Sequence, residues 1–92
     1  MIKSFRHKGL KRLFETSERR GVAPQLAARL RRQLDVLNRA TTTADVNLPG
    51  YRLHQLKGDR AGTWSITVSG NWRITFRFEG QDAFDVDLED YH

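Results

Sequence analysis

Three adjacent residues at the end of the sequence, Asp90, Tyr91 and His92, have side chains suited to acid–base chemistry. A carboxylate, a phenol and an imidazole stand side by side there, directly after a run that alternates like a β-strand. Their ordinary pKa values lie below, above and near neutral pH. We predict that this segment forms a catalytic edge. The alternative interpretation is an ordinary solvated chain end, because most exposed polar residues do no chemistry.

Further polar residues lie at the ends of predicted strands. His54 is near the end of one strand, and Lys57 stands in the loop that follows. Asn71 and Arg73 lie in and just after a turn between two other strands. For Arg73 the functional interpretation is a phosphate contact. Three of these residues also have an alternative interpretation without function. His54 could be an ordinary surface histidine, and Asn71 could be present only because asparagine suits the backbone of a turn. Arg73 could form a cross-strand ion pair.

Length and composition indicate one small domain, residues 1–92. No apolar run is long enough to cross a membrane, and the first residues lack the apolar core of a secretory signal. The chain has no cysteine, which fits the reducing cytoplasm, where we expect this protein to act. Its three histidines do not have a metal-ligand spacing, so we predict no metal and no other cofactor.

The net charge of +5 is unevenly distributed along the chain. Residues 1–46 contain eleven Lys or Arg and four acidic residues, whereas residues 47–92 contain five Lys or Arg and seven acidic residues. A basic half in a domain of this size attracts a polyanion or an acidic partner. The alternative is a solubilising surface that has no partner.

Helical periodicity dominates the first half. Leu10, Leu13 and Phe14 have the spacing of one apolar helix face, which predicts a short helix over residues 8–15. Pro24 suits the first turn of a helix. Leucines at regular helical spacing then predict a second helix that ends near residues 39–40. We also expect a short strand over residues 2–5.

From residue 51 onward the apolar period changes from about 3.6 to about 2. Four strands are predicted, over residues 51–56, 62–68, 72–78 and 84–88. The inward-facing residues of the last three strands are expected to be Trp64, Ile66 and Val68, then Trp72, Ile74, Phe76 and Phe78, then Phe84, Val86 and Leu88. Such a meander is antiparallel and has one apolar face, which two amphipathic helices can cover. The predicted fold class is α+β in two layers.

Pairing of the apolar faces restricts the register, because a slip of one residue turns every side chain over. In the hairpin near residue 70, Ile66 must lie opposite Ile74, with a three-residue turn between the strands. In the next hairpin, one allowed register sets Ile74 opposite Leu88 and Phe78 opposite Phe84. The alternative register is shifted by two residues.

The register also decides which face the polar residues share. In the first register Arg73 lies opposite Glu89, and Asn71 lies opposite Tyr91. In the second register Arg73 lies opposite Asp87, so it has an acidic neighbour in either case. Strict alternation places Tyr91 on the face of Arg73 but turns the residues on either side of Tyr91 to the apolar face. A site that uses all three terminal residues requires the chain to bend after Glu89.

Several blocks spread over the whole chain form a specific combination. They read M-I-K-S-F-R-H-K-G-L over residues 1–10, L-H-Q-L-K-G-D-R-A-G over 53–62, W-S-I-T-V over 64–68, N-W-R-I-T-F over 71–76 and D-Y-H over 90–92. Each block alone is a weak signal. Together they resemble the HigB toxins, which belong to the RelE-like superfamily of bacterial toxin–antitoxin systems.

The resemblance implies a RelE-like, microbial-RNase-like fold, in which two N-terminal helices pack on one face of a small antiparallel sheet and the active site lies on the other face. It implies a metal-independent endoribonuclease that cuts mRNA in the A site of the 70S ribosome and so inhibits translation. It also implies a cognate HigA-type antitoxin that contains a helix-turn-helix. The toxin would contact DNA only indirectly, through this antitoxin.

The resemblance further assigns roles to residues. Four positions treated as catalytic match His54, Asp90, Tyr91 and His92, and two basic positions that contact the substrate match Lys57 and Arg73. These side chains suit RNA transesterification. In that reaction a base removes the 2′-hydroxyl proton, an acid protonates the 5′ leaving oxygen, and a cation stabilises the phosphorane.

The two histidines are the natural acid–base pair, in an order that the sequence leaves open. The two basic residues would stabilise charge. Asp90 would orient a histidine, and Tyr91 would stack on a base or position a phosphate. Asn71 could read an adenine edge.

The rival hypothesis is a basic RNA- or ribosome-binding domain without chemistry, which inhibits translation by occupancy. A DNA-binding repressor is not favoured, because no helix-turn-helix signal is present. The sequence leaves open the codon preference, the stoichiometry of the toxin–antitoxin complex, and whether the basic helices bind rRNA or antitoxin.

Overall fold

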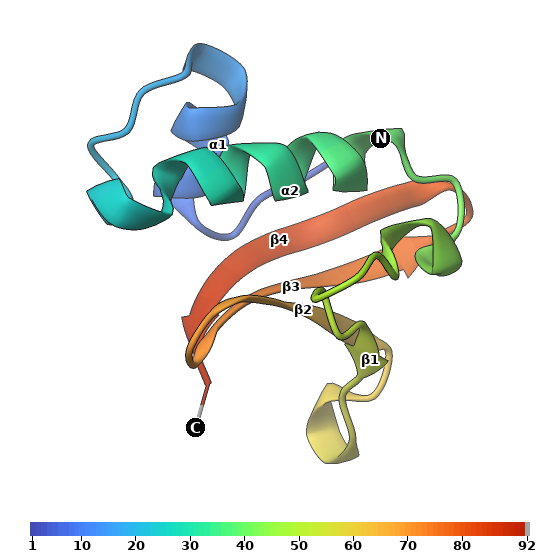
Figure 1. The fold of residues 1–92 in the computed structure, drawn as a ribbon. Helices are drawn as coiled ribbons and strands as arrows, with labels where there is room; N and C mark the ends of the chain where they lie inside the picture. The colour runs from blue at the N-terminus through green and yellow to red at the C-terminus, as the bar shows by residue number, and fades with distance from the viewer. Residues whose placement is uncertain (92) are drawn as a thin grey trace.

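Two helices lie against one face of a four-stranded antiparallel sheet in the computed structural model of the chain, which describes residues 1–91 (Figure 1). The main elements are α1 (Lys8–Thr16), α2 (Ala27–Arg39), β1 (His54–Gln55), β2 (Thr63–Ser69), β3 (Trp72–Glu79) and β4 (Asp82–Asp90). Three short 3-10 turns are η1 (Pro24–Leu26), η2 (Thr43–Val46) and η3 (Gly58–Arg60). The sheet order is β1-β2-β3-β4. The predicted α+β class is confirmed.

Local signals define both ends of α1. The His7 side chain accepts a hydrogen bond from the Leu10 amide at 3.1 Å, which satisfies one free N–H of the first turn. Ser17 ends the helix in the left-handed region with φ of 63°. A Cβ on Gly9 would lie 2.2 Å from the Gly21 carbonyl oxygen, so the loop after α1 can close onto the helix only because this position is glycine.

The apolar face of α2 forms the centre of the core. Leu30, Leu34 and Leu37 are fully buried, as are Ile66 and Ile74 on the facing side of the sheet. The predicted helix is therefore confirmed, although its first turn at Pro24 is the 3-10 turn η1. Over residues 1–91, neither helix has the length and apolar composition that crossing a lipid bilayer requires.

The first hairpin has the predicted register at its centre and a different turn. Ile66 pairs with Ile74, as expected, but Ser69 pairs with Trp72. Val68 is the extra residue of a bulge, so the turn has two residues, and Gly70 provides the positive φ of 55°. The bulge moves Trp72 to the end of the sheet, where it is 37% exposed. The expectation that Trp72 belongs to the core was wrong.

The second hairpin follows the first of the two registers only in part. Ile74 pairs with Leu88, as predicted, but Arg77 pairs with Phe84 because β4 contains one extra residue in between. Phe84 therefore lies on the face of Arg77, and the prediction that it points into the core opposite Phe78 was wrong. Ala83 is buried in its place.

The N-terminal segment explains how this second bulge is stabilised. Asp85 has a positive φ of 54°, and its amide donates to the Ser4 hydroxyl at 2.8 Å. The Val86 amide donates to the Ser4 carbonyl at 3.1 Å, and the Arg6 amide donates to the Val86 carbonyl at 2.8 Å. The expected strand over residues 2–5 consists of two isolated parallel bridges to β4, at Ile2 and Phe5.

The edge strand β1 is shorter than predicted. Arg52 has a positive φ of 50°, which interrupts the expected strand over residues 51–56. The Tyr51 carbonyl still accepts from the Thr67 amide at 2.7 Å. Tyr51 and Leu53 pack against the core, so His54 points to the opposite face.

Candidate active site

The sheet surface opposite the helices, here called the open face, displays the polar residues of all four strands. One row of cross-strand neighbours consists of His54, Ser65, Thr75 and Asp87, and the adjacent row consists of Thr67, Arg73 and Glu89. Cross-strand partners share a face. The register alone therefore brings His54 and Arg73 to one surface, from two strands that are separated by β2.

His54 lies at the edge of this surface with its side chain exposed. Its two ring nitrogens are each 3.4 Å from the Ser65 hydroxyl oxygen, and Nδ1 is 3.2 Å from the Arg52 carbonyl oxygen. Ser65 is only 1% exposed, so the imidazole lies over a buried hydroxyl. The histidine is oriented by β2 and is open to a ligand on its other side, as a proton-transfer group must be.

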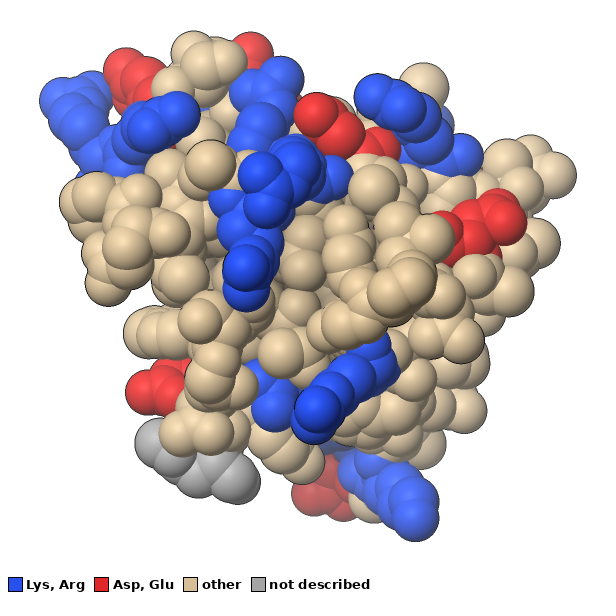
Figure 2. All heavy atoms as spheres, viewed as in Figure 1, with Lys and Arg blue, Asp and Glu red and all other residues tan. Residues whose placement is uncertain are grey.

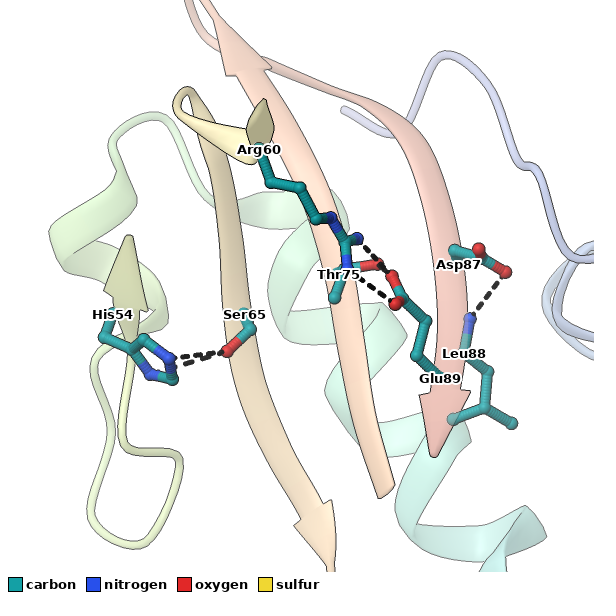
Figure 3. A network of polar contacts seen from close by, with 7 residues as sticks. All are labelled: His54, Arg60, Ser65, Thr75, Asp87, Leu88 and Glu89. Atoms are coloured by element: carbon teal, nitrogen blue, oxygen red, sulfur yellow. Dashed lines mark hydrogen bonds and ion pairs between the residues drawn. The ribbon is translucent and has the colours of Figure 1, made fainter. Parts of the chain in front are cut away.

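A network that the sequence analysis missed crosses the centre of the open face. Arg60, from the turn η3, donates two hydrogen bonds to the Glu89 carboxylate at 2.8 and 2.5 Å, and the Thr75 hydroxyl donates to it at 2.5 Å. Figure 3 shows Arg60 reaching from its loop over β3 towards Glu89. Thr75 is 2% exposed. The two-point contact fixes the guanidinium in one orientation.

The interactions in this network favour the charged forms of both Glu89 and Arg60. The hydrogen bond from Arg60 holds the pKa of Glu89 below its ordinary value, although partial burial opposes this effect. The hydrogen bond to Glu89 raises the pKa of Arg60, and Tyr91 and Asp87 contribute as nearby acidic groups. The pair therefore stays ionised at neutral pH.

Arg73 does not form the cross-strand ion pair that was the alternative interpretation of this residue. Its neighbour across the strands is Glu89, as in the first register, but the carboxylate binds Arg60 instead. Arg73 donates from Nη1 to the carbonyl oxygens of Gly70 and Trp72, at 2.7 and 3.1 Å. Within residues 1–91 no carboxylate neutralises its guanidinium, which is therefore available to an anion.

The other predicted substrate-binding residues lie around this surface. Lys57 is exposed and caps the N-terminal end of η3, three residues before Arg60. Asn71 is exposed in the turn between β2 and β3. The Asn71 carbonyl accepts from the Tyr91 amide at 2.8 Å, so the predicted alignment of these two residues is confirmed.

The terminal residues are divided between the two faces. Strand β4 continues without a bend to Asp90, which pairs with Trp72. Asp90 therefore lies on the face opposite to Glu89, and no bend brings it to the face of Arg73. Tyr91 follows the alternation back towards the open face and is 43% exposed. His92, the fourth predicted catalytic residue, lies outside the described residues.

The open face brings together some of the predicted site residues and also contains a functional candidate that was not predicted. It gathers His54, Arg73 and Tyr91, and it excludes Asp90. Arg60 is the missed residue, and the signal was its place within the L-x-G-x-R-x-G block of residues 56–62. Among residues 1–91, no three His, Asp or Glu side chains lie close enough together to hold a metal ion.

Comparison with known proteins identifies the family. A family model described as the RelE-like toxin of the type II toxin–antitoxin system HigB matches residues 3–92. The chain belongs to this family. It is similar to a protein of Proteus vulgaris named endoribonuclease HigB, with 52% identity over the full length of both chains. It is also similar to toxin HigB-1 of Vibrio cholerae serotype O1, with 29% identity over 97% of this chain and 96% of the relative.

The family confirms the resemblance that the sequence blocks indicated. Membership in a type II toxin–antitoxin family also implies that a partner antitoxin exists. Of the two described residues of the D-Y-H segment, Tyr91 turns towards the open face and Asp90 turns to the other side.

Proposed function

We propose that this toxin is a ribosome-dependent mRNA interferase, which cleaves mRNA in the A site of the 70S ribosome by acid–base transesterification and acts in the cytoplasm. At the level of class, the chain is an endoribonuclease toxin of a toxin–antitoxin system. The observation that supports the proposal is the open face itself. It presents an oriented imidazole at His54 and an uncompensated guanidinium at Arg73 on one surface.

The spacing of these two groups suits a phosphodiester. His54 lies in the row of Thr75, two residues along β3 from Arg73, so the backbones of His54 and Arg73 are about 12 Å apart across the sheet. With an RNA phosphate bound by Arg73, the 2′-hydroxyl of the preceding ribose or the 5′ leaving oxygen would be brought towards His54. His54 transfers one proton of the reaction and His92 the other, and the order stays open.

The remaining residues assist binding and positioning. Arg73 and Lys57 stabilise the charge that develops on the phosphorane. Tyr91 stacks on a base or positions a phosphate, and Asn71 reads a base edge. Asp90 lies on the face of Trp72, so we assign it to positioning His92 rather than to contact with the substrate.

Exposure of the site supports dependence on the ribosome. His54 and Tyr91 are exposed, and α1 and α2 both lie on the other face of the sheet. Acid–base and electrostatic catalysis gain from the exclusion of water. Docking on the ribosome would cover this face and hold the mRNA against it. The proposed antitoxin is of the HigA type, with a helix-turn-helix, and provides the only link to DNA.

Cleavage of one mRNA with and without programmed 70S ribosomes tests this proposal. Primer extension should show cuts only in the programmed complexes, at the codon in the A site, and His92→Gln should abolish them. Cuts at the same rate in free mRNA would contradict ribosome dependence. Inhibition of translation without any cut would favour the alternative, a non-catalytic ribosome-binding domain.

A further inference from the structure

A pocket of about 240 Å³ lies between α2 and the loop that precedes β1, on the helix side of the sheet. Its polar and apolar walls come from different segments: Arg29, Arg32 and Gln33 from α2, and Pro49, Tyr51 and Val68 from the loop and β2. None of these residues belongs to the open face. The pocket is smaller than most small-molecule sites, which suits one side chain with its adjoining backbone.

A buried amide marks this pocket as a polar site. Gln33 is 3% exposed, and its Nε2 donates to the Thr67 carbonyl at 2.9 Å. That bond fixes the orientation of the amide. Within residues 1–91, Gln33 Oε1 is the one buried side-chain nitrogen or oxygen that has no hydrogen-bond partner. Since buried polar atoms are almost always paired, an N–H or O–H donor that enters the pocket would satisfy this acceptor.

Two arginines, Arg29 and Arg32, line the same pocket. Arg29 donates from Nη1 to the Val68 carbonyl at 2.7 Å. Within residues 1–91, neither Arg29 nor Arg32 forms an ion pair, whereas Arg31 on the same helix pairs with Asp35 at 3.5 Å. Figure 2 shows Lys and Arg side chains gathered over α2 on this side of the molecule. The ligand must therefore combine negative charge with a hydrogen-bond donor.

We propose that this pocket binds an acidic side chain of the cognate antitoxin, together with the peptide N–H next to it. The carboxylate would pair with Arg29 and Arg32, and the N–H would donate to Gln33 Oε1. RNA also offers a donor beside each phosphate, the ribose 2′-hydroxyl, but a whole nucleotide is larger than one amino-acid side chain, and a pocket of about 240 Å³ suits the side chain better. The inference rests on the antitoxin partner that the proposed function includes, and not on any catalytic residue.

Three variants separate this contact from general charge effects. Arg32→Gln removes one cation that makes no hydrogen bond or ion pair within residues 1–91. Gln33→Glu places a carboxylate inside the pocket, where it competes with an acidic ligand for both arginines. Arg39→Gln is the matched control, because Arg39 is exposed on the same helix but does not line the pocket.

Isothermal titration of each purified toxin with the full-length cognate antitoxin tests the proposal. Arg32→Gln and Gln33→Glu should each weaken the affinity about tenfold or more and reduce its dependence on salt, whereas Arg39→Gln should change it by about twofold at most. Cleavage of mRNA on programmed ribosomes should remain unchanged in all three. This second readout keeps the test separate from the proposed function.

Two results would overturn the proposal. Unchanged antitoxin affinity in both pocket variants would show that the antitoxin does not use the pocket. Weaker binding to 70S ribosomes with unchanged antitoxin affinity would assign the pocket to RNA instead. Urea unfolding of each free variant controls for folding, and if Gln33→Glu does not fold, Arg32→Gln alone decides the outcome.

Discussion

The two faces of the sheet are held by different kinds of interaction. On the helix face, Leu34, Ile74 and Phe76 are buried among other apolar side chains, and their contacts have no preferred direction. On the open face, Ser65 and Thr75 are just as buried but are polar, and directional hydrogen bonds satisfy the network around Thr75. The comparison suggests that the helix face determines stability and the open face determines chemistry.

The largest expected effect is on the open face and on activity alone. His54→Gln removes a group that transfers a proton, so the rate of cleavage on programmed ribosomes should fall about 100-fold or more. Because His54 is exposed, the free energy of unfolding should change by less than about 0.5 kcal/mol. Single-turnover cleavage and urea unfolding measure the two quantities. An unchanged rate would remove His54 from the site.

The matching change on the helix face should affect stability alone. Leu34→Ala leaves a cavity beneath α2, and the free energy of unfolding should fall by about 3 kcal/mol. The folded fraction should still cleave mRNA at the normal rate at low temperature. Thr67→Ala on the open face is the control for stability. A large loss of catalytic rate in folded Leu34→Ala would mean that the two faces are not separable.

An intermediate effect is expected in the network that stabilises the open face. Glu89→Gln weakens the contact with Arg60, and the free energy of unfolding at neutral pH should fall by about 1–2 kcal/mol. The exposed neighbour Asp59 provides the control, because Asp59→Asn touches neither Glu89 nor Thr75. Urea unfolding at neutral pH measures the difference, and equal stability of the two variants would contradict the role of the network.

The same carboxylate should also contribute to acid sensitivity. The pKa of Glu89 is lowered in the folded protein by the Arg60 hydrogen bond. Its stabilising contribution is therefore complete above the carboxyl pKa of the unfolded chain and is lost as the pH falls through the lower folded value. Glu89→Gln should flatten the acid limb of stability against pH. A variant with the same acid limb as the parent protein would refute this assignment.

The smallest effect on the cleavage rate is expected at Asp90, which was predicted to be catalytic but lies on the face opposite to the open face. Asp90→Asn should lower the cleavage rate about tenfold and leave stability unchanged, because Asp90 is assigned to positioning and is exposed. Comparison of the pH profile of the rate with that of the parent protein tests the positioning role, since the apparent pKa of the histidine step should shift. A loss as large as that of His54→Gln would indicate direct contact with the substrate.

Apolar periodicity was sufficient to predict most of the helix face, with Trp72 and Phe84 as the exceptions. The spacing of Leu30, Leu34 and Leu37 predicted α2, and the pairing of Ile66 with Ile74 followed from matching apolar faces. These features depend on which side chains are buried, and the spacing of apolar residues along the sequence indicates this directly.

The bulges and the open-face network could not be predicted in this way. The bulge at Asp85 depends on a hydrogen bond from its amide to Ser4, which is far away in sequence. Because of this bulge, Phe84 lies on the face of Arg77 and not in the core, where it was predicted. The contact between Arg60 and Glu89 likewise joins a loop to a distant strand, and a pattern along one strand holds no information about such a partner.

Photocrosslinking from the two faces to mRNA tests most directly whether the open face is the RNA-binding surface. A photoreactive side chain at position 67 lies between His54 and Arg73 on the open face, and one at position 28 lies on the exposed side of α2. In programmed 70S complexes, position 67 should crosslink to the A-site codon and position 28 should not. A crosslink to that codon from position 28, with none from position 67, would contradict the assignment of the open face.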